Sequence, residues 1–200
     1  MSEGVDRDKR RFLTLLTTAV GSVGSVFAAV PFVQSMMPSA RAKAAGAPVE
    51  VDISKLEPGA LITEEWRGKP VWIMRRTKAQ LDALPGLADQ LADPDSKVTD
   101  QQPDYATNTA RSIKPEVLVL VGICTHLGCS PQQKTQIGPA AGLGEDWPGG
   151  FYCPCHGSKF DLAGRVYSNV PAPTNLVVPP HSFLSNTRLI IGEDQKKGGA

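Results

Sequence analysis

Two short blocks of the sequence concentrate the side chains that can bind a metal. The first block reads Cys124-Thr125-His126-Leu127-Gly128-Cys129, and the second reads Cys153-Pro154-Cys155-His156-Gly157-Ser158. Together they contain all four cysteines and two of the three histidines of the 200-residue chain. Each block follows its thiol and imidazole closely with a glycine, which lets the backbone turn tightly and direct amide groups at an anionic centre. The pattern therefore predicts a metal centre shared by two loops.

The spacing and the number of ligands narrow the kind of centre. A single zinc ion takes four ligands, and paired ligands are usually separated by about two to four residues. Cys124 and His126 are closer than that, and the two blocks offer six possible ligands. A two-iron, two-sulfur Rieske cluster takes two thiolates on one iron and two imidazoles on the other. We expect Cys124, His126, Cys153 and His156 to be its ligands, with a zinc module as the alternative.

This assignment leaves Cys129 and Cys155 without a role. Two unassigned cysteines in neighbouring loops are expected to form a disulfide in an oxidising compartment. The sequence therefore predicts the bond Cys129–Cys155, provided that this part of the chain is exported.

The sequence of the N-terminal segment predicts that the rest of the chain is exported. Residues 12–40 contain no charge, and the apolar part, 12–37, exceeds the roughly 20 residues that cross a bilayer core. Residues 1–11 carry four basic side chains, which keep that flank in the cytoplasm. We expect a single-pass transmembrane anchor with the rest of the chain on the other side. Arg10-Arg11 resembles a twin-arginine signal, and cleavage near Ala40-Arg41-Ala42 is the alternative to retention.

The remainder is predicted to be one β-rich domain. Nineteen glycines and 17 prolines with few aromatic residues favour strands and turns over a helical bundle. Residues 38–48 are a linker that is either a passive spacer or a hinge, 49–192 are the domain, and 193–200 are a flexible tail. Residues 116–123 give the strongest strand pattern and lead directly to Cys124. Further strands are predicted at 49–53, 71–74, 151–152, 176–178 and 188–191. A helix capped by Thr77 is predicted at 77–88, a glycine-rich excursion at 138–150 and a hairpin at 160–166.

The charge distribution argues against nucleic-acid binding. The formal net charge is only +1, and no dense stripe of Lys or Arg follows the N-terminus, although such a stripe is the usual electrostatic footprint on a nucleic acid.

The two blocks resemble the motifs of the Rieske iron–sulfur subunit family of ubiquinol–cytochrome c reductase. Pro171-Ala172-Pro173 is similar to the proline loop of that family, and the resemblance extends from the anchor to about Gly192. It implies a mainly β protein: a transmembrane helix, then an antiparallel β-sandwich with a small cluster-binding subdomain at about 120–175. Two departures are Phe160, where many relatives have a tyrosine that donates to a ligand sulfur, and Val170, where many have glycine.

The resemblance also implies roles and partners. His126 and His156 would take a hydrogen bond and then a proton from ubiquinol while the cluster takes one electron, which then passes to a c-type cytochrome. Ser158 would donate to a bridging sulfide, and Leu127 and Pro171 would form a docking surface. The implied partners are a cytochrome b subunit, a c-type cytochrome subunit, ubiquinol and a bacterial inner membrane, with the Rieske domain in the periplasm.

Two other protein classes compete with this reading. They are the small Rieske subunit of a molybdenum oxidase and a soluble ferredoxin, and the anchor and the two extra cysteines count against the ferredoxin. Outside the blocks, we expect His181 to be a surface residue and Trp66, Trp72 and Trp147 to be packing residues.

Overall fold

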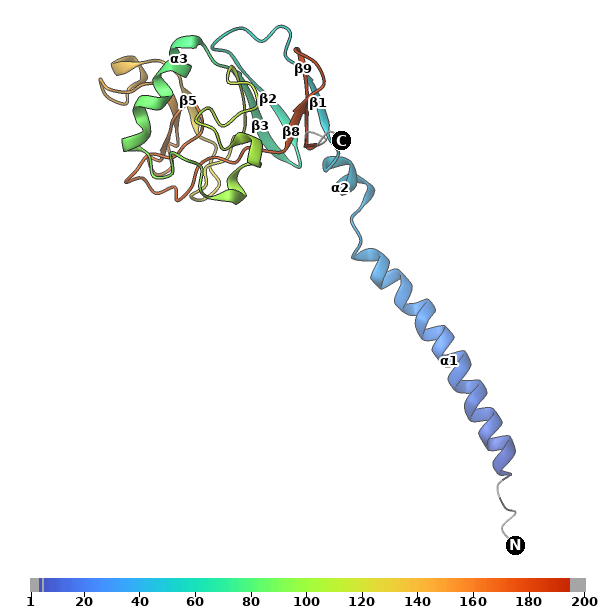
Figure 1. The fold of residues 1–200 in the computed structure, drawn as a ribbon. Coiled ribbons are helices and arrows are strands. Elements are labelled where there is room, and N and C mark those ends of the chain that lie inside the picture. The colour runs from blue at the N-terminus through green and yellow to red at the C-terminus, as the bar shows by residue number, and fades with distance from the viewer. Residues whose placement is uncertain (1–3, 5, 195–200) are drawn as a thin grey trace. The chain divides into compact units, whose positions relative to one another are not determined.

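The computed structural model describes residue 4 and residues 6–194. The chain divides into two compact units between Ala44 and Ala45 (Figure 1). The predicted tail falls partly on residues 195–200, which lie outside the described residues.

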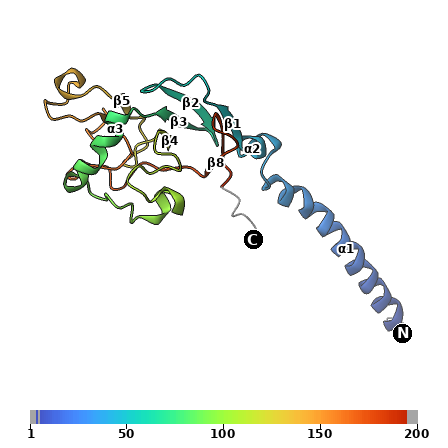
Figure 2. The same ribbon diagram turned by 45° about the horizontal axis from the view of Figure 1, so that its top comes forward.

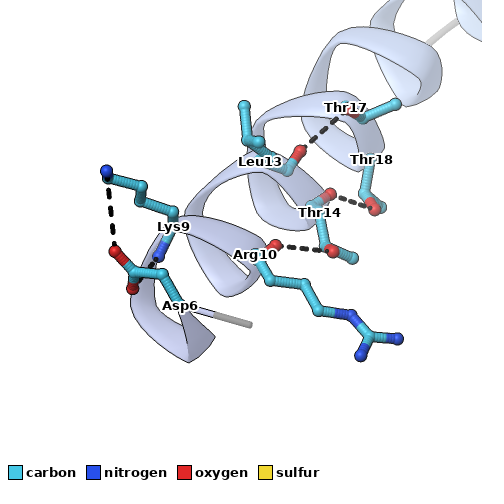
Figure 3. Close-up of a pocket in the computed structure, with 7 residues that line it drawn as sticks. All are labelled: Asp6, Lys9, Arg10, Leu13, Thr14, Thr17 and Thr18. Atoms are coloured by element: carbon cyan, nitrogen blue, oxygen red, sulfur yellow. Dashed lines mark hydrogen bonds and ion pairs between the residues drawn. The ribbon is translucent and has the colours of Figure 1, made fainter. Parts of the chain in front are cut away.

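The first unit contains the long helix α1 (Arg7–Ser35) and all but the last residue of the short helix α2 (Ala40–Ala45). Asp6 caps α1, because its carboxylate accepts hydrogen bonds from the backbone N–H groups of Asp8 and Lys9 at 3.1 and 3.2 Å. The hydroxyls of Thr14, Thr17 and Thr18 donate to carbonyl oxygens one turn earlier, as Figure 3 shows. These bonds satisfy the polar groups within the helix itself, as an apolar environment requires. The shallow pocket of Figure 3 lies among these side chains and contains none of the predicted site residues.

The length of α1 suits a membrane. Its 29 residues span about 43 Å, compared with a hydrocarbon core of about 30 Å. Among the described residues α1 is the one helix long and apolar enough to cross a bilayer, and a signal sequence would meet the same criterion. No residue of α1 is buried within the structure, so its apolar surface needs another environment.

The second unit is built on two antiparallel sheets. One has the order β1 (Val49–Asp52), β9 (Arg188–Ile191), β8 (His181–Phe183). The other has the order β2 (Leu61–Trp66), β3 (Lys69–Arg75), β4 (Val117–Val121), and Figure 2 shows its strands side by side. The two sheets enclose one apolar core, whose members include Val51, Val71, Ile73, Val119, Leu189 and Ile191.

The strands β3 and β4 are buried on both faces of their sheet. Val71 and Ile73 point into the core shared with β1 and β9. Their neighbours Trp72 and Met74 point the other way, into a second core that also contains Cys124 and Cys153. Because side chains alternate along a strand, β4 carries apolar residues at every position and is buried throughout. The strand before the first cysteine block is therefore fixed from both sides.

The cysteine blocks belong to a third, smaller sheet. It has the order β5 (Gln132–Lys134), β6 (Gly150–Tyr152), β7 (Lys159–Phe160). The first block lies between β4 and β5, and the second connects β6 to β7. The excursion between β5 and β6 lies at the opposite end of this unit from the β1–β9–β8 sheet in both Figure 1 and Figure 2. A helix, α3 (Lys78–Ala83), and four short 3₁₀ helices complete the unit: Leu84–Gln90, Thr99–Gln101, Asp104–Ala106 and Gly138–Ala141.

Most of the sequence-based expectations for the domain are confirmed. The fold is an antiparallel β-sandwich with an inserted small sheet and an N-terminal apolar helix, as expected. Thr77 caps α3 in a capping box with Gln80, and the turn at Ala163-Gly164 forms a hairpin closed by the bridge between Phe160 and Val166. The three tryptophans are buried, as packing residues should be.

Two predictions are wrong. Residues 176–178 form no strand, because their backbone groups bond singly to different segments: Val177 accepts from Val121, and Val178 donates to Gln101. His181 is not a surface residue but is fully buried. It lies on β8, where its ring packs edge-on against the ring of Tyr105 with centroids 5.6 Å apart.

Candidate metal centre

The two cysteine blocks fold into loops with the same hydrogen bonds. In the first, the N–H of Cys124 donates to the carbonyl of Cys129 at 2.7 Å, and the N–H of Gly128 donates back to Cys124 at 3.1 Å. In the second, Cys153 donates to Ser158 at 2.8 Å, and Gly157 donates back to Cys153 at 2.9 Å. Gly128 and Gly157 have φ values of 82° and 79°, where a side chain would be strained. The glycines thus close two matching loops.

Two buried thiols lie at the start of these loops. Cys124 and Cys153 are free cysteines, each 2% exposed, and both belong to the core behind the loops. Burial raises the pKa of the Cys124 thiol, while the backbone N–H of His126 and the hydroxyl of Ser158 act in the opposite direction. Its neighbour Cys153 raises this pKa further, so two thiols lie side by side where a cation would stabilise their thiolates.

The two loops also bring two imidazoles together. The ring centroids of His126 and His156 are 4.7 Å apart and the rings are nearly perpendicular. His126 is half-buried, and its Nδ1 is buried without a hydrogen-bond partner, whereas His156 is exposed. Buried polar atoms usually have partners, so this nitrogen is available to bind a metal. Two thiols and two imidazoles from matching loops fit the two-iron cluster, because one iron takes sulfur ligands and the other takes nitrogen ligands.

The two remaining cysteines form the expected disulfide. Cys129 and Cys155 are bonded, with their Cα atoms 6.7 Å apart, within the range that a disulfide spans. The sulfurs of Cys129, Cys153 and Cys155 lie within 4.8 Å of one another. This trio is not a metal site, because both sulfurs of the disulfide have no thiolate to offer.

The predicted proline loop is joined to both cysteine loops. The hydroxyl of Thr125 donates to the carbonyl of Thr174 at 2.7 Å, and the N–H of Ala172 donates to the hydroxyl oxygen of Ser158 at 3.0 Å. Ala172 is buried while Pro171 is exposed. As a donor, the hydroxyl of Ser158 acts on the Cys124 thiol, whose pKa it lowers. The sequence could not predict these contacts, because a threonine or serine in a loop does not indicate which backbone group its hydroxyl will bond.

The other predicted residues lie in two environments. Phe160 is fully buried in the core that contains Cys124 and Cys153. Val170 is partly buried and packs against that core and also against a small cluster around Trp147 and Tyr167. Leu127, in contrast, is 71% exposed.

The sandwich with its inserted sheet and the paired Cys–His loops define a Rieske-type iron–sulfur protein. The family model described as "Rieske [2Fe-2S] domain" matches residues 88–180, and one described as "Ubiquitinol-cytochrome C reductase Fe-S subunit TAT signal" matches residues 1–39. The "Ubiquinol-cytochrome c reductase iron-sulfur subunit" of Allochromatium vinosum is 60% identical over 97% of this chain and 93% of its own. That of Blastochloris viridis is 41% identical over 96% of each chain.

The chain therefore belongs to the family of ubiquinol–cytochrome c reductase iron–sulfur subunits, components of an oxidoreductase complex, and it carries one [2Fe-2S] Rieske cluster. A chain of a solved structure named "Hyperthermophilic respiratory Complex III" is also similar, with 28% identity, a TM-score of 0.48, and coverage of 88% of this chain and 98% of that chain.

Proposed function

We propose that Cys124, His126, Cys153 and His156 are the four ligands of the cluster and that the chain transfers single electrons from ubiquinol to a c-type cytochrome. The observation that carries the ligand set is the unpartnered Nδ1 of His126 beside two buried free thiols and the second imidazole. Neutral imidazoles in place of two thiolates make such a centre easier to reduce, which suits a quinol donor.

When bound, the cluster supplies a one-electron acceptor. The chain's own residues would bind the quinol, accept its proton and stabilise the charge on the cluster. One of the two ligand histidines, His126 or His156, would use its second ring nitrogen to accept a hydrogen bond from a quinol hydroxyl and would then take the single proton that leaves with the electron. Ser158, fully buried at the end of the second loop, would use its hydroxyl proton to stabilise negative charge on a sulfur.

The exposed Leu127 and Pro171 would form the surface that docks on the partners. Leu127 follows a ligand in sequence and is too exposed to serve mainly as packing, which favours a docking role. We propose cytochrome b and a c-type cytochrome as these partners, with residues 12–37 as a retained anchor and 38–48 as a hinge. The basic flank before α1 supports a cytoplasmic N-terminus and a periplasmic Rieske domain in a bacterial inner membrane.

The ligand set is tested by histidine replacement with an internal control. His126→Gln and His156→Gln should abolish the visible absorption and the reduced-state electron paramagnetic resonance of the cluster. His181→Gln is the matched control, because it removes the third histidine, which lies outside both loops, and should leave the spectrum in place. A normal Rieske spectrum in either ligand variant would refute the assignment.

The proton role is tested by the pH dependence of the midpoint potential. If the imidazoles release protons on oxidation, the potential of the purified protein should fall as the pH rises through their range. A midpoint potential that does not change with pH would contradict the role of His126 and His156 as proton acceptors.

A further inference from the structure

Three arginine side chains are buried behind the second cluster loop. Arg76, Arg111 and Arg165 expose 2%, 0% and 1% of their surface, although arginine is almost never fully buried unless it is paired. All three bind the turn made by residues 161–165, which begins three positions after Ser158. We call this segment the arginine-held turn.

Two of the arginines bind the backbone of the arginine-held turn. Arg76 donates from Nη1 to the carbonyl of Leu162 at 2.8 Å. Arg111 donates from Nη1 to the carbonyls of Ala163 and Gly164 at 3.2 and 3.3 Å. Three consecutive carbonyl oxygens therefore face two guanidinium groups, and the direction of the chain beyond the second loop is set by charge-assisted bonds.

The third arginine belongs to the turn itself. Arg165 donates from Nε to the carboxylate of Asp161 at 2.7 Å and from Nη2 to the carbonyl of Leu84 at 2.7 Å. Asp161 also accepts from the backbone N–H groups of Ala163 and Arg165, at 2.9 and 2.8 Å. The pair is buried on both sides, so it is a fixed part of the turn.

The buried charges do not balance. Within the described part of the chain, neither Arg76 nor Arg111 has a carboxylate within ion-pair distance, and Asp161 is paired with Arg165. Burial lowers the pKa of Arg76 and of Arg111 to about 10, so both remain protonated at neutral pH. The carboxylate of Asp161 raises the pKa of both arginines from beyond ion-pair distance. Glu116 acts in the same direction on Arg76, and Asp93 does so on Arg111, but Glu116 is exposed and Asp93 is partly exposed. Three buried cations thus face one buried anion.

The arginine-held turn follows the second ligand loop directly and packs in the same core as the two free thiols. Leu162, Ala163 and Val166 share one apolar core with Cys124 and Cys153. The three residues from Ser158 to Asp161 span at most about 10 Å of chain. Buried charges are poorly screened by solvent at such distances.

The backbone at Arg111 supports a dedicated role. Its φ is +46°, a conformation that residues other than glycine rarely adopt and that persists only where the surrounding structure fixes it. With this backbone conformation the Arg111 guanidinium contacts the arginine-held turn through Nη1. Its Nη2 donates to Oε1 of Gln102 at 2.9 Å.

We propose that Arg76, Arg111 and Arg165 are positioning residues of the metal centre, which hold the turn behind the second cluster loop and whose excess positive charge raises the midpoint potential of the cluster. The inference rests on the ligand set proposed above. Reduction adds an electron to the cluster, and nearby buried cations stabilise the added negative charge, so the reduced form is favoured.

The test is a redox titration of the full-length, cluster-loaded protein, followed by circular dichroism and by electron paramagnetic resonance. Arg111→Met removes one buried cation, Arg111→Lys keeps the charge without the planar fork, and Asp161→Asn removes the single buried anion. Arg188→Met is the control, because Arg188 is half-exposed and pairs with Glu50 on the β1–β9–β8 sheet. We expect a lower potential in Arg111→Met, a higher one in Asp161→Asn, and values near the parent in Arg111→Lys and Arg188→Met.

Two results would overturn the inference. One is an unshifted potential in Arg111→Met, and the other is an equal shift in Arg111→Lys, which would assign the effect to packing. If Arg111→Met does not hold its cluster, Asp161→Asn decides, and a potential at or below the parent value overturns the charge account. The ligand set fails by a different result, namely a retained spectrum in the His126 or His156 variants.

Discussion

Removing the disulfide should destabilise the cluster-free protein more than the loaded one. The bond joins positions separated by 26 residues, and closing such a loop removes unfolded-state entropy worth about 3.5 kcal/mol at room temperature. The double variant Cys129→Ser, Cys155→Ser should therefore lower the free energy of unfolding of the cluster-free protein by about that amount.

The bound cluster changes this expectation. The proposed ligands Cys124 and His126 would be joined through it to Cys153 and His156, so the cluster would close almost the same loop as the disulfide. Two cross-links around one loop are partly redundant, because the second closes a chain that is already short. The loss of stability in the loaded protein should be clearly smaller, and the double variant should lose its cluster faster, since loop closure then falls entirely on cluster binding.

Urea denaturation of the cluster-free and loaded forms, with the decay of the visible spectrum on heating, measures both effects. The parent protein under a strong reductant provides a control that carries no mutation. Equal losses of stability in the two forms would refute the redundancy argument, and an unchanged stability of the cluster-free variant would refute the entropic role of the bond altogether.

Three further predictions concern buried side chains. Phe160→Tyr should raise the midpoint potential, because a new hydroxyl in the core of Cys124 and Cys153 would donate to a ligand sulfur, and an unchanged potential with that hydroxyl bonded to Cys124 would contradict this. Arg165→Leu should lower the free energy of unfolding of the cluster-free protein in urea by about 3–5 kcal/mol, because it leaves the Asp161 carboxylate buried without its partner. A loss below about 1 kcal/mol, which is typical of a surface ion pair, would show that the buried pair contributes little to stability. His181 has its pKa lowered by burial, so the unfolded chain binds its proton first as the pH falls, and the parent should lose stability below about pH 6.5. His181→Phe should show a shallower decline over that range, and parallel declines would exclude His181 as the cause.

The sequence could predict the metal centre because its information is local. A thiol, an imidazole and a glycine at fixed spacing describe a complete loop, and two copies describe the centre. The strand of residues 116–123 and the cap at Thr77 are also local signals, and both elements formed within a few residues of their expected bounds.

The failures come from contacts that local patterns do not encode. Residues 176–178 have the composition of a strand but find single partners on separate segments instead of a ladder. Arg76 looks like one more surface charge, and its partner Leu162 is 86 residues away. The sequence around His181 also does not predict that the ring of Tyr105 packs against it. Burial of a polar side chain is decided by the tertiary arrangement, and there the sequence alone gave no usable signal.

If residues 38–48 act as the proposed hinge, the short helix α2 sets the length of the tether that carries the Rieske domain. As a helix its six residues span about 9 Å, whereas the same residues fully extended span about 20 Å. Melting this single element would therefore lengthen the reach of the domain by about 11 Å while α1 and the sandwich keep their structures. A helix this short is marginal in water, so the change would be readily reversible. A tether of this size also holds the domain at an effective concentration on the order of millimolar near any surface of the same assembly, and weak, quickly reversed docking would then be enough for repeated encounters.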